Sequence, residues 1–243
     1  MRSDSSQWPR RQVVSFGRRD GRRQGQYART PDPALADYVV RAEAGEREAS
    51  LHPSWRFDAA EAFGRVAPLV VEIGSGTGEA TLAYAASHPE LNHLAVEVYR
   101  PGASRTVIRA GAAGLSNVRV LEADGRALLA TGLPDASVAA LHVYFPDPWP
   151  KKRHHKRRLV DAGFAGDVAR VLAPDGVLRL ATDWEHYAEQ MLEVCSACPG
   201  LTNPHAAEGG WAPRFAGRPE TLFERKGVAA GRIIRDLELR KSS

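Results

Sequence analysis

Three glycines follow a short apolar segment in the sequence Glu72-Ile73-Gly74-Ser75-Gly76-Thr77-Gly78. Glycines in a turn between a strand and a helix let the backbone pass close to a ligand. Because position 79 is Glu, the spacing lacks the third glycine of a dinucleotide-binding fingerprint. The carboxylate of Glu72 favours a ligand with a cationic amine, which S-adenosylmethionine carries, over one with a pyrophosphate. Glu72, Gly74, Gly76 and Gly78 are therefore predicted to bind that cofactor, with a purely structural tight turn as the alternative.

Two further acids stand at the ends of the next apolar segments. Glu97 follows Glu72 by 25 residues, at the position where an acid accepts hydrogen bonds from both ribose hydroxyls of a nucleoside cofactor. Asp124 ends the following segment and is predicted to meet the adenine edge. Each acid alone is more often a solvated residue or a helix cap, but acids at three successive strand ends favour a cofactor site.

Asp147 lies between two prolines in the segment Phe145-Pro146-Asp147-Pro148-Trp149-Pro150. Prolines restrict the backbone, so they hold the carboxylate in place beside the crevice instead of leaving it to move in solvent. We therefore predict that Asp147 is the catalytic residue and that it also lies against the cofactor.

The chain carries a net charge of +4, but the charge is concentrated in two places. Residues 1–30 hold eight arginines and two aspartates, and residues 151–158 read KKRHHKRR. Such a distribution favours binding to a polyanion, with a solvated loop and a solubilising tail as the alternative. Trp149 offers a flat face for a base. The residues predicted to contact an RNA backbone are Arg153, His154, His155, Lys156, Arg157 and Arg158.

Apolar segments of strand length alternate with segments of helical pattern from residue 69 onward. Strands are expected over residues 69–73, 94–98, 118–121, 138–145 and 177–181, and helices over 32–48, 78–87, 101–113, 157–171 and 184–197. This alternation predicts an α/β fold with a doubly wound, Rossmann-like parallel sheet. Ligands bind such sheets at the carboxyl ends of the strands, where the acids described above fall.

Composition bounds the remaining possibilities. The length of 243 residues and the 43% hydrophobic content suit one globular domain over residues 31–243, preceded by a basic, disordered tail over residues 1–30. No apolar run is long enough to span a membrane, and the start has no apolar signal-peptide core, so a cytoplasmic location is expected. The pair Cys195 and Cys198 lacks a second pair of ligands, so no metal site is expected.

Four spaced motifs closely resemble the bacterial tRNA (guanine-N7)-methyltransferase family, and the resemblance extends over about residues 14–235. The loop from Tyr144 to Arg158 matches its PDPW-K-x-RH-x-KRR signature nearly residue for residue. The stretches TDWEHYA from Thr182 and RPETLFERKG from Arg218 are similar to its later motifs, and SFGRR from Ser15 to its Arg-rich start. Leu222 departs from the pattern, because family members often carry a basic residue there.

The resemblance implies a class I methyltransferase fold and a reaction. An enzyme of this family transfers the methyl group of S-adenosylmethionine to N7 of a guanine, guanine 46, in the variable loop of tRNA. The resemblance also points to Asp147 as the acid beside the reacting base. On this interpretation tRNA is the partner, binding weakens steeply with salt, and a monomer and a homodimer remain equally open.

Guanine selectivity follows from donors and acceptors. Guanine presents N1–H and N2–H₂, from which acids such as Asp183 and Glu224 accept, whereas adenine would leave such an acid unpaired. The alternatives are a helix cap for Asp183 and an exposed strand acid for Glu224. The remaining residues expected to contact the substrate are Lys151, Thr221, Leu222 and Phe223.

Two other classes of function remain open from the sequence. One is an RNA-binding protein without catalytic activity that kept the fold, against which Glu72, Glu97 and Asp147 argue. The other is a small-molecule methyltransferase with an incidental basic loop, against which residues 151–158 argue.

Overall fold

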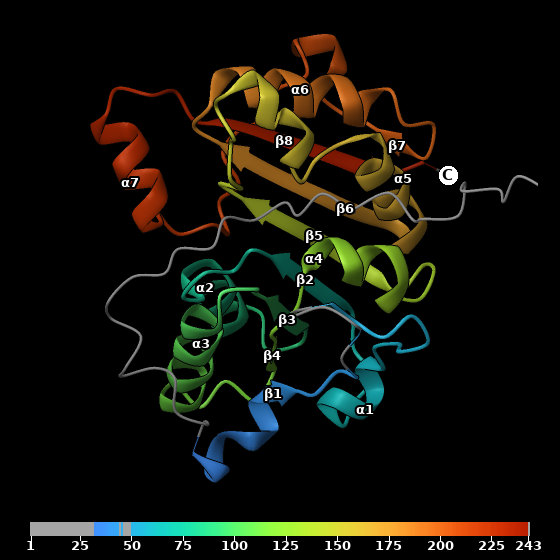
Figure 1. Cartoon of the computed structure of the whole chain (residues 1–243), viewed down its shortest axis with the longest axis vertical. Helices are drawn as coiled ribbons and strands as arrows, with labels where there is room; N and C mark the ends of the chain where they lie inside the picture. Colours follow the sequence, from blue (N-terminus) through green and yellow to red (C-terminus); the bar gives the residue numbers. More distant parts are fainter. Residues whose placement is uncertain (1–31, 44, 46–49, 243) are drawn as a thin grey trace, which may run out of the picture.

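The computed structural model describes residues 32–43, 45 and 50–242, so the tail predicted over residues 1–30 lies outside the described residues. Eight strands in these ranges form one sheet with the order β1-β4-β3-β2-β5-β6-β8-β7 (Figure 1). Their bounds are β1 (Val39–Val40), β2 (Leu69–Ile73), β3 (Asn92–Val96), β4 (Val118–Leu121), β5 (Val138–Tyr144), β6 (Leu172–Thr182), β7 (Leu201–Thr202) and β8 (Arg235–Lys241).

Strands β1 to β6 run parallel, and β8 is antiparallel to both β6 and β7. Every residue of β2 is buried, as is typical of a central parallel strand covered on both faces. From β2 the chain continues to β3 and β4 on one side and then to β5 and β6 on the other. The expected doubly wound α/β sheet is confirmed, and its order reverses between β2 and β5, where such sheets bind ligands.

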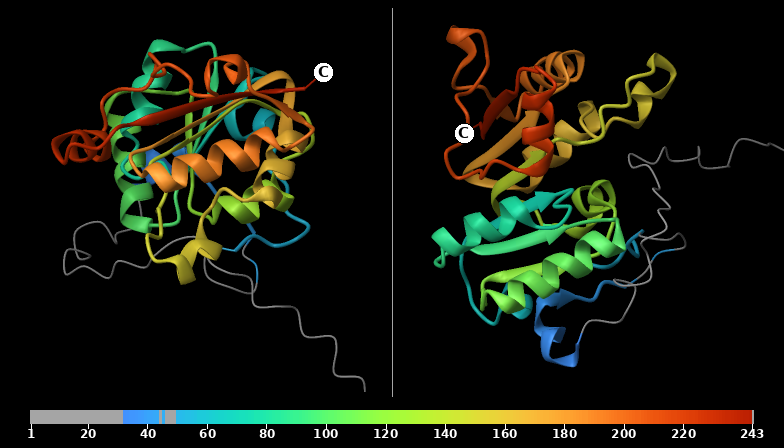
Figure 2. Two further views of the ribbon diagram at one scale, coloured as in Figure 1. Left: turned by 90° about the horizontal axis from the view of Figure 1, so that it is seen from above. Right: turned by 90° about the vertical axis from the view of Figure 1, so that its left-hand side faces the viewer.

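Helices cover both faces of the sheet (Figures 1 and 2). Apolar side chains of α2 and α3 pack on β3 and β4, while those of α1, α5 and α6 join the larger core on the opposite face. Helix α7 lies apart, beyond the carboxyl ends of β5 and β6 (Figure 1). The helix bounds are α1 (Ala59–Phe63), α2 (Glu79–Ser87), α3 (Arg100–Ala112), α4 (Gly125–Ala127), α5 (Ala162–Val171), α6 (Glu185–Ser196) and α7 (Leu222–Ala229).

Short helical turns connect several of these elements. They are the 3₁₀-helices η2 (Pro33–Tyr38), η4 (Lys152–Arg157) and η5 (Ala206–Glu208), and the π-helix η3 (Leu128–Gly132). The segment that carries η4, yellow in Figure 2, projects from the body of the molecule.

Two expected helices differ from the structure. The helix expected over residues 32–48 is wrong, because the chain forms η2 and then pairs Val39 and Val40 with β4 as an edge strand. The helix expected from residue 157 begins at Ala162, because the Asp161 carboxylate caps it by accepting the N–H of Phe164 at 2.8 Å.

Strand β8 was absent from the expected elements, although its sequence alternates Leu237 and Leu239 with charged residues. Both leucines are buried in the core. Glu238 faces Arg179 of β6 in the register and forms an ion pair with it at 3.4 Å. Only two of the seven residues of β8 are apolar, so the strand contains no apolar run that would indicate it in the sequence.

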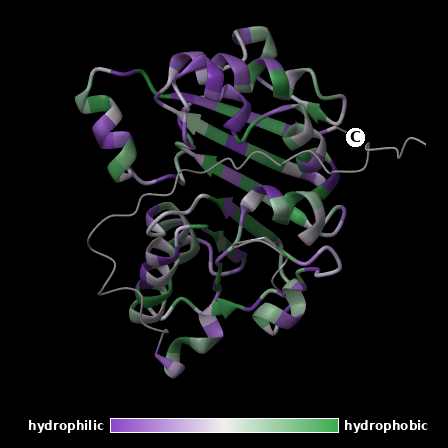
Figure 3. Cartoon of the chain, in the orientation of Figure 1, coloured by the Kyte–Doolittle hydropathy of each residue, from purple (hydrophilic) through white to green (hydrophobic). Residues whose placement is uncertain are grey.

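Hydrophilic residues dominate the outer surface of α6, whereas the central strands carry hydrophobic residues (Figure 3). In the described part of the chain, no helix has both the length and the apolar character that a membrane span requires.

Candidate functional site

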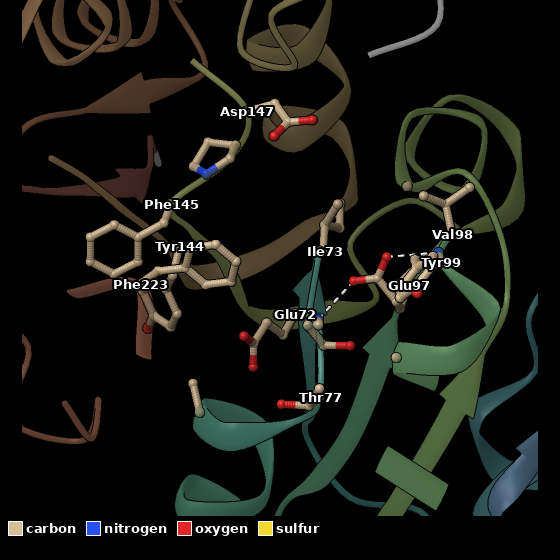
Figure 4. A pocket seen from close by; sticks show the side chains of 18 of the residues that line it. Glu72, Ile73, Thr77, Glu97, Val98, Tyr99, Tyr144, Phe145, Asp147 and Phe223 are labelled. Atoms are coloured by element: carbon tan, nitrogen blue, oxygen red, sulfur yellow. Dashed lines mark hydrogen bonds between the residues drawn. The ribbon is translucent and has the colours of Figure 1, made fainter. Parts of the chain in front are cut away.

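A pocket of about 480 Å³ opens at the carboxyl ends of β2, β3, β4 and β5. Five carboxylates line it, and no lysine, arginine or histidine is among the described residues that do so. The acids are Glu72, Glu79, Glu97, Asp124 and Asp147. A pocket with this charge favours a ligand that carries positive charge. Figure 4 shows Asp147 on one side of the pocket and Glu72 and Thr77 on the other.

The glycine turn after β2 forms one wall of this pocket. Gly74, Gly76 and Gly78 have φ of 77°, 57° and 76°, a region that favours glycine. A Cβ on Gly78 would also lie 2.6 Å from the Thr106 side chain. Both Thr106 and Gly102 belong to α3, and a Cβ on Gly102 would lie 2.6 Å from the Gly76 carbonyl oxygen. The expected glycines therefore hold a tightly packed turn that exposes its backbone to the pocket.

Glu97 is held in one orientation by the backbone. Its Oε2 accepts the N–H of Gly76 at 2.7 Å, and its Oε1 accepts the N–H of Tyr99 at 2.8 Å (Figure 4). Burial raises the pKa of this carboxyl group. Because each carboxylate oxygen can accept more than one hydrogen bond, Glu97 keeps acceptor capacity toward the pocket.

Glu72 lies at the base of the pocket and is only 5% exposed. The hydroxyl of Thr81 in α2 donates a short hydrogen bond to its Oε2. Burial raises the pKa of Glu72 to about 7, and the negative charge of Glu97 contributes to the increase. A buried acid that is half ionised near neutral pH gains most from a ligand that brings a positive charge.

Asp124 follows β4 and both caps α4 and lines the pocket. Its carboxylate accepts the N–H of Arg126 at 2.9 Å, as a helix cap does. Partial burial raises its pKa. The Asp124 side chain therefore caps α4 and lines the pocket at the same time.

The loop after β5 brings Asp147 to the rim. Asp147 is exposed, and Phe145 and Trp149 on either side have φ of 52° and 44°, which are strained values for bulky residues. The guanidinium of Arg158 donates to the Pro148 carbonyl at 2.9 Å. The Arg157 guanidinium lies over the Trp149 ring at 4.9 Å. Both contacts hold the part of the loop that follows Asp147.

The start of α7 closes the pocket on the side of Phe145. Thr221, Leu222 and Phe223 all line it, and the latter two side chains are about half exposed. The Thr221 hydroxyl caps α7 by accepting the N–H of Glu224 at 3.2 Å. The Leu222 N–H donates to the Glu79 carboxylate of α2 at 2.9 Å, which ties α7 to the glycine turn.

The structure differs from expectation at Glu224, which does not line the pocket. It is buried in α7, where it accepts from Arg214 at 2.8 and 3.1 Å and from Arg218 at 3.1 Å. Burial alone would raise the pKa of Glu224, but these two cations outweigh it and lower the pKa. The carboxylate expected to read a base, or to lie exposed on a strand, is already paired within the protein.

Asp183 is also engaged by a cation. Its carboxylate accepts from Arg232 at 2.6 Å and lies against Gly227 of α7. The expected helix cap at Asp183 is wrong, because Trp184 is the cap residue of α6 and Thr182 accepts its N–H. Asp183 therefore contributes to the attachment of α7 rather than to the lining of the pocket.

Three of the residues expected to contact RNA, Arg153, Lys156 and Arg157, are solvent-exposed, as are their neighbours Lys151 and Lys152. His154 and His155 are partly exposed, and desolvation together with the neighbouring cations lowers the pKa of each. Both histidines are therefore more often neutral than an isolated imidazole would be at the same pH.

Arg158 differs from this group, because it is 3% exposed and turned inward. Its guanidinium donates to Gln190 at 2.6 Å and lies 4.7 Å from the Tyr187 ring centroid. The side chain therefore supports the loop from within, and a contact between Arg158 and RNA stays a prediction.

Sequence reasoning missed several residues of the pocket wall. Tyr99, Tyr144 and Phe145 line it, and the Tyr144 hydroxyl is buried without a hydrogen-bond partner among the described residues. Tyr144 ends β5 as Ile73 ends β2, and Phe145 follows directly, so their position at the carboxyl end of a strand was the available signal.

Comparisons with known proteins agree on the kind of chemistry. A family model described as "Putative methyltransferase" matches residues 66–237. A tRNA (guanine-N(7)-)-methyltransferase of Nocardioides sp. is 49% identical over 95% of this chain and 88% of its own length. The corresponding protein of Alkalilimnicola ehrlichii is 44% identical over 96% of this chain and 94% of its own length.

A solved structure confirms the fold at lower similarity. The 16S rRNA methyltransferase KamB has a TM-score of 0.52 and 19% identity, and the match covers 84% of this chain and all of that chain. At this identity the match supports the α/β architecture alone.

Proposed function

This chain belongs to the bacterial tRNA (guanine-N7)-methyltransferase family, and from that premise we propose that its target is guanine 46 of the tRNA variable loop and that Asp147 is its catalytic residue. The family fixes the reaction, in which N7 of a guanine in tRNA receives a methyl group from S-adenosylmethionine. A catalytically inactive RNA-binding protein and a small-molecule methyltransferase are both set aside by this membership.

The pocket fits S-adenosylmethionine in charge and in the placement of its acceptors. The ligand carries an amine and a sulfonium, and the pocket presents five carboxylates with no basic side chain among the described residues of its lining. Glu72 would hold the amine and Glu97 the ribose hydroxyls, while Asp124 would face the base. The backbone of Gly74, Gly76 and Gly78 would form the wall against which the cofactor lies.

When bound, S-adenosylmethionine supplies a methyl group attached to a sulfonium. The methyl group is transferred, and the electron pair of the carbon–sulfur bond stays on the sulfur. Guanine N7 has a lone pair and no proton, so the protein need not remove a proton before attack. As the ring becomes positively charged, a fixed carboxylate at the rim stabilises that charge. Asp147 is the exposed acid of the pocket on the rigid loop after β5, and we assign this role to it.

Positioning supplies the rest of the catalysis. Holding two reacting groups in line is worth about 7–11 kcal/mol of a barrier. Thr221, Leu222 and Phe223 lie on the pocket wall next to the Asp147 loop, where they would contact the target base, and Lys151 would contact its phosphate. With the carboxylates of Asp183 and Glu224 paired to arginines, these four residues are the better candidates for substrate contact.

The target must expose N7 to the protein. The major groove of an A-form duplex is too deep and narrow for this, so a guanine in a loop or a tertiary junction is the suitable substrate. The exposed cations Arg153, Lys156 and Arg157 beside the pocket would lie along the RNA backbone, with His154 and His155 between them. We propose a cytoplasmic location, since tRNA is the substrate.

The observation that carries the proposal is an acidic pocket and a projecting basic segment joined by one rigid loop, in which Asp147 lies. The test is mass spectrometry of nucleosides from an unmodified tRNA transcript incubated with the protein and S-adenosylmethionine. A transcript with adenine in place of guanine 46 is the matched control. We expect 7-methylguanosine only in the first transcript, and its appearance in both would place the target elsewhere in the tRNA.

A further inference from the structure

A second pocket adjoins the end of the loop that carries Asp147, where Pro150 lines it. Four of its lining residues come from the segment around η4, and two come from the start of α6. They are Pro150, Lys152, His155, Arg158, Trp184 and His186. None of these described residues is acidic, and two of them, Lys152 and Arg158, carry a permanent positive charge at neutral pH. This charge is opposite in sign to that of the first pocket.

Arg158 contacts both histidines that line the second pocket. Its guanidinium lies 3.3 Å from His155 Nε2 and 3.3 Å from His186 Nδ1. A guanidinium has only donors, so both ring nitrogens accept, and the protonated nitrogen of His186 is Nε2. The two imidazole rings lie edge to face with centroids 5.0 Å apart. The buried Arg158 thus holds both histidines, and the donors among the other lining residues are the Lys152 ammonium, the His186 Nε2–H and the Trp184 indole N–H.

The two pockets are held at a short, fixed separation. Pro146 and Asp147 line the first pocket and Pro150 lines the second. Four residues of chain span at most about 14 Å. The same Arg158 donates to the Pro148 carbonyl between them, so the floor of the second pocket also supports the loop of the first. An RNA strand with its guanine in the first pocket can therefore reach the second within a few nucleotides.

We propose that the second pocket receives one phosphodiester group of the substrate RNA, next to the methylated guanine in sequence. The inference rests on the proposed function, because the RNA strand is brought to the pocket by the guanine bound beside Asp147. A phosphodiester carries one negative charge and oxygens that only accept, which matches a pocket with cations and N–H donors and no acid among its described lining. The site thereby fixes the register of the strand relative to the cofactor pocket.

A chemical double-mutant cycle tests the proposal. Synthetic tRNAs carry a single uncharged methylphosphonate at each phosphodiester within four nucleotides of the target guanine. Their affinity is measured with the full-length protein and S-adenosylhomocysteine, so that no methyl group is transferred. We expect one methylphosphonate to weaken binding to the unsubstituted protein about tenfold, the usual effect of losing a hydrogen-bonded charge.

The matched variants are Lys152→Ala in the second pocket and Lys156→Ala on the same segment outside it. Both remove one exposed positive charge. The same methylphosphonate should weaken binding less than twofold in Lys152→Ala and still about tenfold in Lys156→Ala. His186→Ala, which also removes a wall of the second pocket, should behave as Lys152→Ala does.

The proposal would be overturned if the methylphosphonate caused the same loss of RNA affinity in Lys152→Ala and Lys156→Ala. It would also be overturned if no methylphosphonate in the series weakened binding to the unsubstituted protein. Production of 7-methylguanosine by the unsubstituted protein is measured in parallel. If no 7-methylguanosine is formed, the proposed function is wrong. If it is formed normally but both variants lose the same affinity, only the assignment of the second pocket is wrong.

Discussion

Arg218 forms two hydrogen bonds with the carboxylate of Asp236, at 2.8 and 3.2 Å, and its side chain has no exposed surface. The same guanidinium donates to Glu224 at 3.1 Å and lies 5.2 Å from the Tyr144 ring centroid. Asp236 belongs to β8, Glu224 to α7 and Tyr144 to β5. One buried cation therefore joins the central sheet, the helix that closes the pocket and a wall of the pocket.

Arg218→Ala should destabilise the protein by about 3–5 kcal/mol, because it leaves the buried carboxylate of Asp236 without its cation and takes one of two cations from Glu224. The control is Arg240→Ala, since Arg240 pairs with Glu238 on the surface and is 60% exposed, where the loss should be under about 1 kcal/mol. Urea unfolding followed by circular dichroism measures both. Similar losses in the two variants would show that the buried network does not hold β8 and α7 together.

Asp147→Asn should reduce single-turnover methyl transfer by about 10²–10³-fold, because the variant keeps the size of the side chain and removes the charge. Calorimetric titration with S-adenosylhomocysteine and with tRNA should still show binding. An unchanged rate would remove Asp147 from the catalytic mechanism. A loss of cofactor binding equal to the loss of rate would make it a binding residue instead.

Cofactor affinity should depend on pH through Glu72, whose pKa is about 7 in the ligand-free protein. A cationic amine favours the ionised carboxylate, so affinity should fall as the pH decreases from 8 to 6. Glu72→Gln should bind more weakly at pH 8 and should lose this part of the pH dependence. Calorimetry at several pH values measures both, and an identical pH profile in the variant would contradict the prediction.

Glu72 should also cost stability in the ligand-free protein. Its pKa in the folded state lies above the ordinary value of 4.5, so the folded state holds the proton more tightly than the unfolded state. The contribution of Glu72 to stability is therefore greatest below pH 4.5 and is lost as the pH rises through about 7. Glu72→Gln should raise the free energy of unfolding at pH 8 by about 1–3 kcal/mol. A lower stability of the variant at pH 8 would be the opposite of what we expect.

Gly102→Ala should weaken cofactor binding by displacing the glycine turn, because the new Cβ would lie 2.6 Å from the Gly76 carbonyl oxygen. The matched control is Gly166→Ala in α5, where a Cβ meets nothing within 4 Å. That control should keep its cofactor affinity and gain about 0.5–1 kcal/mol of stability. Calorimetric titration and thermal unfolding separate the two outcomes, and equal cofactor affinity in both variants would refute the role of this contact.

Much of the site followed from the sequence because it depends on local order along the chain. Glu72 is the last residue but one of the apolar strand β2, and in a parallel sheet the ends of successive strands meet at one edge. Glu97, Asp124 and Asp147 were placed at that edge by the same reasoning, and all three line the pocket. Their roles toward cofactor and substrate stay predictions until the experiments above are made.

The structure differs from the sequence-based predictions where pairing between distant segments decides whether a residue is buried. Glu224 and Arg158 look like exposed charged residues in sequence, but partners 28 residues away for Arg158 and 10 for Glu224 bury them. Strand β8 looks like a charged segment in sequence, but Glu238 pairs with Arg179 across the sheet and Asp236 pairs with Arg218 in the loop before α7. Such pairing cannot be read from hydrophobic periodicity, since the charges are satisfied only in three dimensions.

The insertion of β8 between β6 and β7 has a consequence for the order of events during synthesis. Strands β1 to β6 and the glycine turn precede residue 183, so this parallel half can assemble while later segments are still being translated. The guanidinium of Arg218 finds its carboxylate partner in β8 only after Asp236 has emerged. The ribosome therefore makes the cofactor half of the site first, and the wall formed by α7 is anchored in a late step of folding.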